Sequence, residues 1–155
     1  MSDQKKKIKQ IDTLRRVREI KENQKKNHLA SSLKQQQVYL DQLKFLEELK
    51  VQVYENIKQD QQGEIDLSQM MKYQMYLRQV HIKSILANAT VKEIEVEVNK
   101  RRLELIKANQ NKVVSEKLLA KQKEVLKMEL NKQENKTLDE VGSMIVQNKS
   151  TGETE

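Results

Sequence analysis

The fold is decided by residues 70–105, which read MMKYQMYLRQVHIKSILANATVKEIEVEVNKRRLEL. Apolar residues return every seven positions along this stretch, and a second series follows three positions behind the first. The first series is Met70, Leu77, Ser84, Val91, Val98 and Leu105, and the second is Tyr73, Val80, Ala87 and Ile94. A repeat of seven is typical of a helix that packs along a narrow seam in a left-handed coiled coil.

The seam loses apolar character beyond this stretch. The first series continues as Lys112, Leu119 and Leu126, and the second as Arg101, Ala108, Ser115 and Gln122. Polar residues at seam positions weaken the apolar contact between paired helices. We therefore expect looser packing in the distal half of this helix.

Residues 4–60 form another stretch that contains neither Gly nor Pro and is rich in helix-forming residues. Its apolar stripe is Leu29, Leu33, Gln36, Leu40, Leu43, Leu46, Val53 and Ile57, with an irregular step of three residues near Leu46. Nearer the N-terminus, Ile8, Ile11, Leu14, Val17 and Ile20 step by three. That spacing drifts around a helix, so we expect the first turns to have a less fixed partner face.

The segment Gln59–Asp66 lies between the two stretches and carries turn signals. Gly63 is expected to adopt a left-handed conformation that ends the first helix. Asp66 is expected to cap the second helix, with Gln69 completing a capping box. Ile65 and Met70 stand at the positions of a hydrophobic staple around that cap.

A connection this short makes the two helices antiparallel neighbours. We predict an all-α fold, a long antiparallel two-helix coiled-coil hairpin that forms a single domain over residues 1–141. The first helix is expected over about 4–60, the loop over 61–66 and the second helix over about 67–141. The polar residues 142–155, which begin at Gly142, are expected to be a flexible tail.

Composition excludes several classes of function. The chain has no Cys, so it has neither a disulfide nor a thiolate metal site. Catalysis needs converging groups in a concave site, and two helices that share one seam offer little concavity. The sequence therefore indicates no catalytic residue, no cofactor, no metal and no small-molecule substrate, and we do not expect an enzyme. No apolar run is long enough to span a bilayer, and no apolar segment follows the basic N-terminus as in a signal peptide, so a cytoplasmic location is expected.

The two ends of the predicted hairpin differ in chemistry. Residues 1–30 carry ten Lys or Arg against four Asp or Glu, a net charge of +6 out of +7 for the whole chain. All five aromatic residues lie at the loop end, namely Tyr39, Phe45, Tyr54, Tyr73 and Tyr76. They could close the hairpin core or form a docking patch, because Tyr is favoured at protein interfaces.

The basic cluster permits three interpretations. It could be a solvated helix face, a surface that docks on an acidic protein, or a nucleic-acid contact. Nucleic acid is the least favoured, because no aromatic residues are interleaved with the charges and no known binding module accompanies them. A basic nucleic-acid-binding coiled coil and a generic helical adaptor remain the alternatives to the function considered next.

Three segments resemble the FliJ family of flagellar export proteins, which are related to type III secretion proteins. They are the basic opening LRRVREIKENQKKNHLASS, the aromatic-rich MMKYQMYLRQVHIKSI of residues 70–85, and the C-terminal part that contains Leu138-Asp139-Glu140. The resemblance covers nearly the whole chain. It implies a coiled coil, similar to the stalk of a rotary ATPase, that assists flagellar protein export.

The resemblance also implies partners and contact residues. The partners would be the flagellar export ATPase ring, the cytoplasmic domain of the export gate and the export chaperones, with peripheral association at the cytoplasmic face of the membrane through them. The ATPase-facing basic patch would be Arg15, Arg16 and Arg18. Docking to the export gate would use residues at the loop end, namely Leu46, Leu49, Val53, Tyr54, Tyr73, Tyr76 and Val80.

Overall fold

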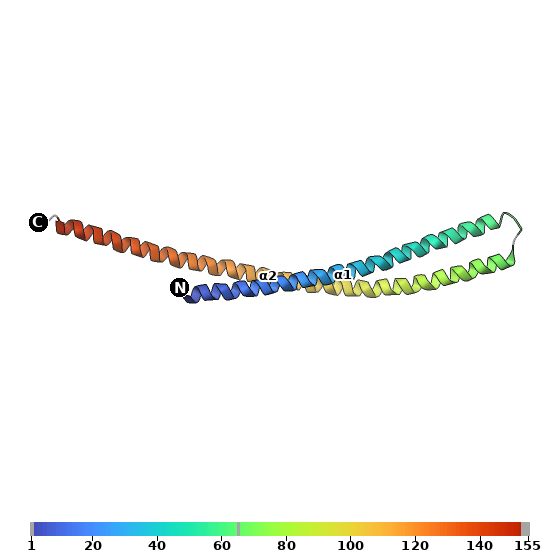
Figure 1. Ribbon diagram of the computed structural model, residues 1–155, viewed down its shortest axis with the longest axis horizontal. Helices are drawn as coiled ribbons and strands as arrows, with labels where there is room; N and C mark the ends of the chain where they lie inside the picture. The colour runs from blue at the N-terminus through green and yellow to red at the C-terminus, as the bar shows by residue number, and fades with distance from the viewer. Residues whose placement is uncertain (1, 65, 153–155) are drawn as a thin grey trace. The chain divides into compact units, whose positions relative to one another are not determined.

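The computed structural model describes residues 2–64 and 66–152. Over these residues the chain forms two helices and no strand: α1 (Ser2–Asp60) and α2 (Leu67–Gly152) (Figure 1). The Gln4 side-chain amide donates to Gln122 Oε1 over 2.7 Å, and Tyr73 Oη donates to Asp60 Oδ2 over 2.5 Å. Early residues of α1 therefore meet late residues of α2, which confirms the predicted all-α antiparallel hairpin.

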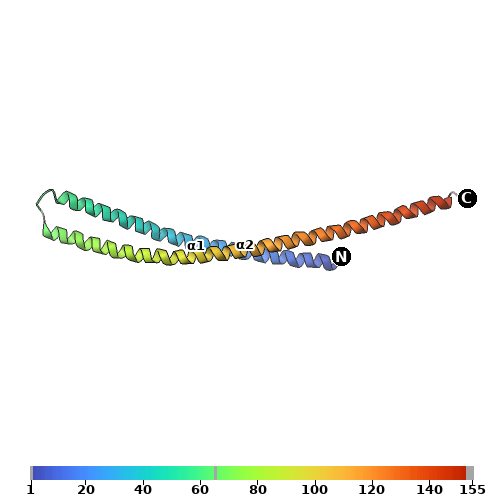
Figure 2. The same ribbon diagram turned by 180° about the vertical axis from the view of Figure 1, so that it is seen from behind.

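The chain divides into two compact units, and both helices contribute to each. Unit 1 combines α1 up to Glu22 with α2 from Ala108 onward. Unit 2 is Asn23–Lys107 and includes the turn. Within unit 2 the helices lie side by side in both views (Figures 1 and 2).

The seam predicted on α2 is confirmed in unit 2. Val80, Ala87, Val91, Ile94 and Val98 are buried, and the remaining members of the two series up to Leu105 are at least half-buried. Ser84 keeps its place on the seam because its hydroxyl donates to the carbonyl of Val80 over 2.8 Å. The polar side chain is therefore satisfied within its own helix and needs no partner across the seam.

The stripe predicted on α1 is only partly right. From Leu29 to Ile57, buried and half-buried residues recur in alternating steps of three and four, with Leu49 and Asn56 also half-buried beside this series, so the seam has no irregular step near Leu46. Ser32 and Tyr39 occupy seam positions, whereas Leu33 and Leu40 are exposed beside the seam. The regular heptad of α2 selects a regular partner face on α1, and apolar residues outside that face remain in solvent.

The turn differs from its prediction in one respect and agrees in another. No glycine among the described residues has a positive φ, so Gly63 does not take the expected left-handed conformation. Instead, the amide of Gln61 donates to the carbonyl of Ile57, which closes α1 with one more helical bond. Asp66 caps α2 as predicted, since its Oδ1 accepts from the Ser68 amide over 3.0 Å.

The other predicted capping contacts fare differently. The Gln69 side chain does not complete a capping box; its amide donates to Tyr73 Oη over 3.3 Å. The expected staple between Ile65 and Met70 involves a residue that lies outside the described ones. The hydroxyl of Tyr73 thus accepts from Gln69 and donates to Asp60, and it joins the end of α1 to the first turns of α2.

α2 continues past its expected end near residue 141 and reaches Gly152. Gly142 lies inside the helix with open space where a Cβ would stand. One glycine in a helix costs only about 1 kcal/mol relative to alanine, and helix-forming residues flank it on both sides. Residues 127–150 are exposed throughout, so no described part of the chain covers this last stretch of α2.

Candidate docking surfaces

Unit 1 is held by a seam of mixed apolar and polar side chains. Ile11 and Leu119 are buried, and so is Glu22, whose exposed fraction is only 2%. Lys112 Nζ lies 3.1 Å from Glu22 Oε2, and Asn109 Nδ2 donates to the same oxygen over 3.3 Å. A buried carboxylate requires such partners, because an uncompensated charge in this position would be strongly destabilising.

The three arginines of the predicted ATPase-facing patch lie in different surroundings. Arg18 Nη1 donates to the Asn111 carbonyl over 2.8 Å and to Ser115 Oγ over 2.6 Å, so this side chain bridges the two helices of unit 1. Arg15 pairs within its own helix with Asp12 and Glu19. Arg16 is 70% exposed and pairs with Asp12 Oδ2 over 3.2 Å. The structure therefore does not gather all three guanidinium groups on one open face.

The sequence analysis did not identify the polar residues of α1 that occupy seam positions. Seven-residue steps from Ile8 give Arg15, Glu22 and Leu29, and seven-residue steps from Ile11 give Arg18, Lys25 and Ser32. The heptad spacing could have revealed them, but an apolar search passes over charged residues. In unit 2 the same pattern continues with Lys25 Nζ, which lies 3.4 Å from Glu104 Oε2.

Two ionised side chains of unit 1, Asp12 and Lys112, limit the pH range over which this unit is most stable. The hydrogen bond from Arg15 is the main reason that the pKa of Asp12 is lowered, and the hydrogen bond with Glu22 is the main reason that the pKa of Lys112 is raised. A lowered acid pKa contributes stability that is present above the ordinary value and lost as pH falls through the folded value. A raised lysine pKa contributes stability that is present below the ordinary value and lost as pH rises through the folded value.

We expect the urea midpoint to be nearly constant between about pH 5 and pH 9, and to fall below about pH 4 and above about pH 10.5. Helicity monitored by circular dichroism at fixed pH values would measure this. In a Lys112→Met variant the alkaline fall should become smaller while the acid fall remains. An alkaline fall of unchanged size in that variant would contradict the assignment.

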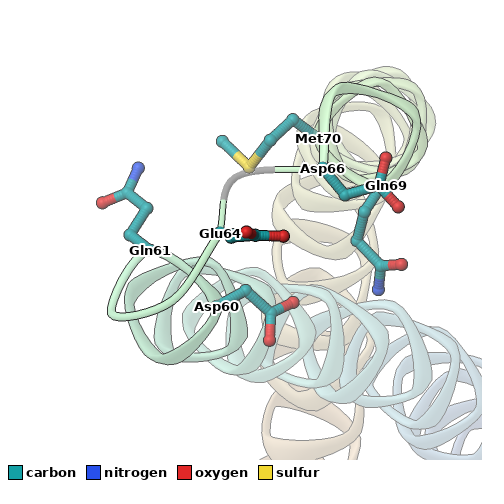
Figure 3. Close-up of a pocket in the computed structure, with 6 residues that line it drawn as sticks. All are labelled: Asp60, Gln61, Glu64, Asp66, Gln69 and Met70. Atoms are coloured by element: carbon teal, nitrogen blue, oxygen red, sulfur yellow. The ribbon is translucent and has the colours of Figure 1, made fainter.

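At the turn, six residues surround a shallow polar hollow of about 250 Å³ (Figure 3). Its lining consists of Asp60, Gln61, Glu64, Asp66, Gln69 and Met70. Two of the three carboxylates already have structural partners, since Asp60 accepts from Tyr73 and Asp66 caps α2. No group of three or more His, Cys, Asp or Glu among the described residues is arranged to hold a metal ion.

The seven predicted gate-docking residues divide into three sets by their burial. Leu46, Val53 and Val80 are buried in the seam of unit 2 and do not reach a surface. Leu49 and Tyr73 are half-buried, whereas Tyr54 and Tyr76 are exposed. Tyr73 therefore closes the turn, as one of the two expectations had it, whereas Tyr54 and Tyr76 present ring surface to solvent and their docking role stays a prediction.

Leu49 and Tyr76 share an edge of unit 2. Each immediately precedes a seam position, as do Gln42, Lys83 and Thr90. The last three line a hollow of about 190 Å³ together with Tyr39, Leu86 and Ala87. Tyr54 follows a seam position instead, so it belongs to the other edge. The geometry therefore supports one continuous edge built around Leu49, Tyr76 and this hollow.

Over the described residues, neither α1 nor α2 contains a segment both long and apolar enough to cross a membrane. Comparison with curated proteins found no significant match, and comparison with solved structures found none either.

The model of one protein family, described as Flagellar FliJ protein, matches residues 6–151. The match covers nearly the whole of both helices and the turn between them. This family is a structural component of flagellar protein export, which agrees with an antiparallel pair of helices whose exposed side chains suit contact with other proteins. The extent of the match and the hairpin fold together show that the chain belongs to the FliJ family.

Proposed function

We propose that this protein is a coiled-coil stalk of the flagellar export apparatus. Unit 1 would bind the ring of the export ATPase, and the turn end of unit 2 would bind the cytoplasmic domain of the export gate. Through the gate the protein would associate peripherally with the cytoplasmic face of the membrane, and it would also assist the export chaperones and their substrates. The observation that carries the proposal is the difference between the seams of the two units.

Unit 1 suits a contact with the ATPase ring that must form and release. It is bridged by side chains such as Arg18 and Lys112, and its outer faces carry charged residues such as Arg16. Exposed ion pairs contribute only about 0–1 kcal/mol each, so a ring that surrounds this segment would hold it through many weak and exchangeable contacts. The proposed ATPase contact therefore rests mainly on Arg16, because Arg18 bridges the two helices and Arg15 is paired within α1.

The edge built around Leu49 and Tyr76 suits a firmer contact. The exposed ring of Tyr76 offers a large contact area with a polar tip, as at interface hot spots, and a shallow hollow with a mixed polar and apolar lining lies on the same edge. The buried residues Leu46, Val53 and Val80 would support this edge from the seam, and Tyr73 would fix the turn next to it. Tyr54 would contribute only if the gate also reaches the opposite edge.

The test uses one substitution near the turn end of unit 2 and one substitution in unit 1. Tyr76→Ala is expected to weaken binding to the purified gate domain about 30-fold, the effect of losing one tyrosine hot spot. It should leave stimulation of the export ATPase unchanged. Arg16→Glu is expected to lower ATPase binding and stimulation while gate binding stays as in the wild type. Calorimetry and turnover assays would measure the two arms.

Tyr54→Ala serves as the matched control, because it removes the same side chain from the other edge. Equal helicity of all variants in circular dichroism excludes unfolding as the cause. The stalk function would be refuted if the wild-type protein bound neither partner, or if each substitution weakened both interactions equally.

A further inference from the structure

Unit 1 has two sides that differ in composition. Its seam follows two seven-residue series on each helix. Because the helices are antiparallel, the residues that come immediately before seam residues lie on one side of the pair, and the residues that come immediately after them lie on the other. The hollow in unit 2 shows the same arrangement, since Gln42 of α1 and Lys83 and Thr90 of α2 all precede seam residues and line it together.

Apolar side chains from both helices gather on the first of these sides. They are Leu14 and Val17 of α1 and Val114, Leu118 and Val125 of α2, and their exposed fractions are 36–59%. Along each helix they are separated by three, four or seven residues, which is the spacing of a surface that another helix covers. Single exposed apolar residues are ordinary, but a group built from two helices points to a contact surface.

The charged residues on this side are all lysines. Between residues 7 and 21 of α1 and between 111 and 125 of α2 they are Lys7, Lys21 and Lys121. None of the three forms an ion pair within the part of the chain that the structure describes. Glu124 stands two positions from the nearest seam residue and belongs to the outer face of α2. We call the three lysines and the five apolar residues the lysine-rimmed face.

The opposite side of unit 1 contains carboxylates. Asp12 and Glu19 both follow seam residues and stand there. Asp12 pairs with Arg15 over 3.0 Å and with Arg16 over 3.2 Å. It also attracts Lys123 of α2, which follows a seam residue as well. Cations on that side therefore have carboxylates beside them, whereas the lysines of the lysine-rimmed face have none.

The register of the two helices brings two of these lysines close to the same level. Gln4 donates to Gln122, so Lys7 stands nearly level with Lys121, at one end of the apolar group. Lys21 stands at the other end. Like charges that face each other are unfavourable, and a carboxylate placed beside them would relieve the repulsion. The face therefore has an apolar centre and two ends that suit negative charge.

We propose that the lysine-rimmed face binds an acidic amphipathic helix of a partner protein. The apolar residues of that helix would pack beside the seam, where α1 and α2 together offer a third helix an apolar border. Its carboxylates would lie opposite Lys7, Lys21 and Lys121, which gives the contact its charge complementarity. This inference does not depend on the proposed stalk function, because Arg16 stands on the opposite side of unit 1.

Two other occupants fit this face less well. A second copy that used the same face would place lysines against lysines in a two-fold contact. An anionic lipid surface would attract the lysines, but an interfacial helix buries the outer face of a single helix. Here the apolar residues border a seam and come from two helices, which suits a third helix.

A synthetic peptide about four heptads long can serve as the probe, with Leu at its seam positions and Glu at the flanking ones. Fluorescence anisotropy of the labelled peptide would measure its binding to the full chain. Leu118→Glu should weaken this binding at least about 30-fold, because it removes a central apolar contact and opposes the carboxylates of the peptide. Ala120→Glu is the matched control, since Ala120 lies two residues later on α2 but on the opposite side. It should change the affinity less than about twofold.

A charge exchange tests the part played by the lysines. A second peptide with Lys in place of every Glu should bind the wild-type chain at least about tenfold more weakly than the acidic peptide. In a variant that combines Lys7→Glu and Lys121→Glu, this preference should be reversed. The control combines Lys5→Glu and Lys9→Glu, which make the same change in net charge on the opposite side, and it should keep the preference for the acidic peptide.

Circular dichroism would verify equal helicity, and the charge exchange, which removes no apolar contact, decides the outcome if Leu118→Glu loses helicity. The proposal would be overturned by an acidic peptide that does not bind, by equal effects of Leu118→Glu and Ala120→Glu in folded chains, or by an unchanged preference after the charge exchange. Binding to phosphatidylglycerol vesicles without binding to the acidic peptide would assign the face to lipid instead. Arg16→Glu should leave peptide binding unchanged, so the ATPase assay remains a separate test.

Discussion

Replacing Glu22 by alanine is expected to lower the free energy of unfolding by about 3–5 kcal/mol. The Glu22 carboxylate is buried, and its Oε2 is shared by Lys112 and Asn109. Without it, the ammonium group of Lys112 loses its hydrogen-bonded carboxylate and keeps only the weaker attraction of Glu116 and Glu19. Removal of one partner of a buried ion pair leaves an uncompensated charge, which is why the effect should far exceed that of a surface pair.

Urea unfolding followed by circular dichroism would measure this change. The control is Glu19→Ala, which removes an exposed carboxylate that pairs with Arg15 over 3.3 Å and should cost less than about 1 kcal/mol. The double variant Glu22→Leu with Lys112→Leu should be at least as stable as the wild type, because apolar side chains replace the whole pair. A Glu22→Ala protein with the wild-type urea midpoint would contradict this description of the seam.

Val53→Asp is expected to lower the free energy of unfolding by a similar amount, about 3–5 kcal/mol. Val53 is 7% exposed and lies in the seam of unit 2, where a carboxylate would lose most of its hydration. The matched control is Val51→Asp, since Val51 lies two residues earlier on the same helix and is 50% exposed. That substitution should change the free energy of unfolding by no more than about 0.5 kcal/mol beyond the loss of helix propensity.

This pair of variants also separates folding from docking. A loss of gate binding in Val53→Asp together with a lowered melting temperature would reflect the damaged seam. A loss of gate binding in Val53→Asp with an unchanged melting temperature would mean that Val53 contacts a partner directly, contrary to its burial. Tyr76, which is exposed, is the better position for testing docking itself.

The seam of α2 and the position of the turn could be predicted from the sequence, because few alternatives compete with them. From Met70 to Leu105 only one face of a helix carries apolar residues at both series of heptad positions. Asp66 was also predictable, since a carboxylate before the first helical turn satisfies free backbone amides wherever it occurs. These features depend on local spacing, which the sequence contains in full.

The facing side of α1 could not be predicted in the same way. Leu33 and Leu40 are as apolar as Leu29 and Leu43, and only packing against α2 decides which of them are covered. The same holds for the candidate sites: Arg15, Arg16 and Arg18 are one basic cluster in the sequence, yet Arg18 bridges the helices while Arg16 is open to solvent. A side chain of one type can serve in a seam or on a surface.

The sequence by itself therefore determined that this protein is a pair of antiparallel helices with an aromatic turn end and a basic N-terminal segment. The tertiary structure alone decided which polar residues enter the seam and which tyrosines remain exposed. It also decided that α1 ends at the turn without a left-handed glycine. The physical reason is that heptad spacing is a property of one helix, whereas burial, ion pairing and turn geometry arise only when the second helix is in contact.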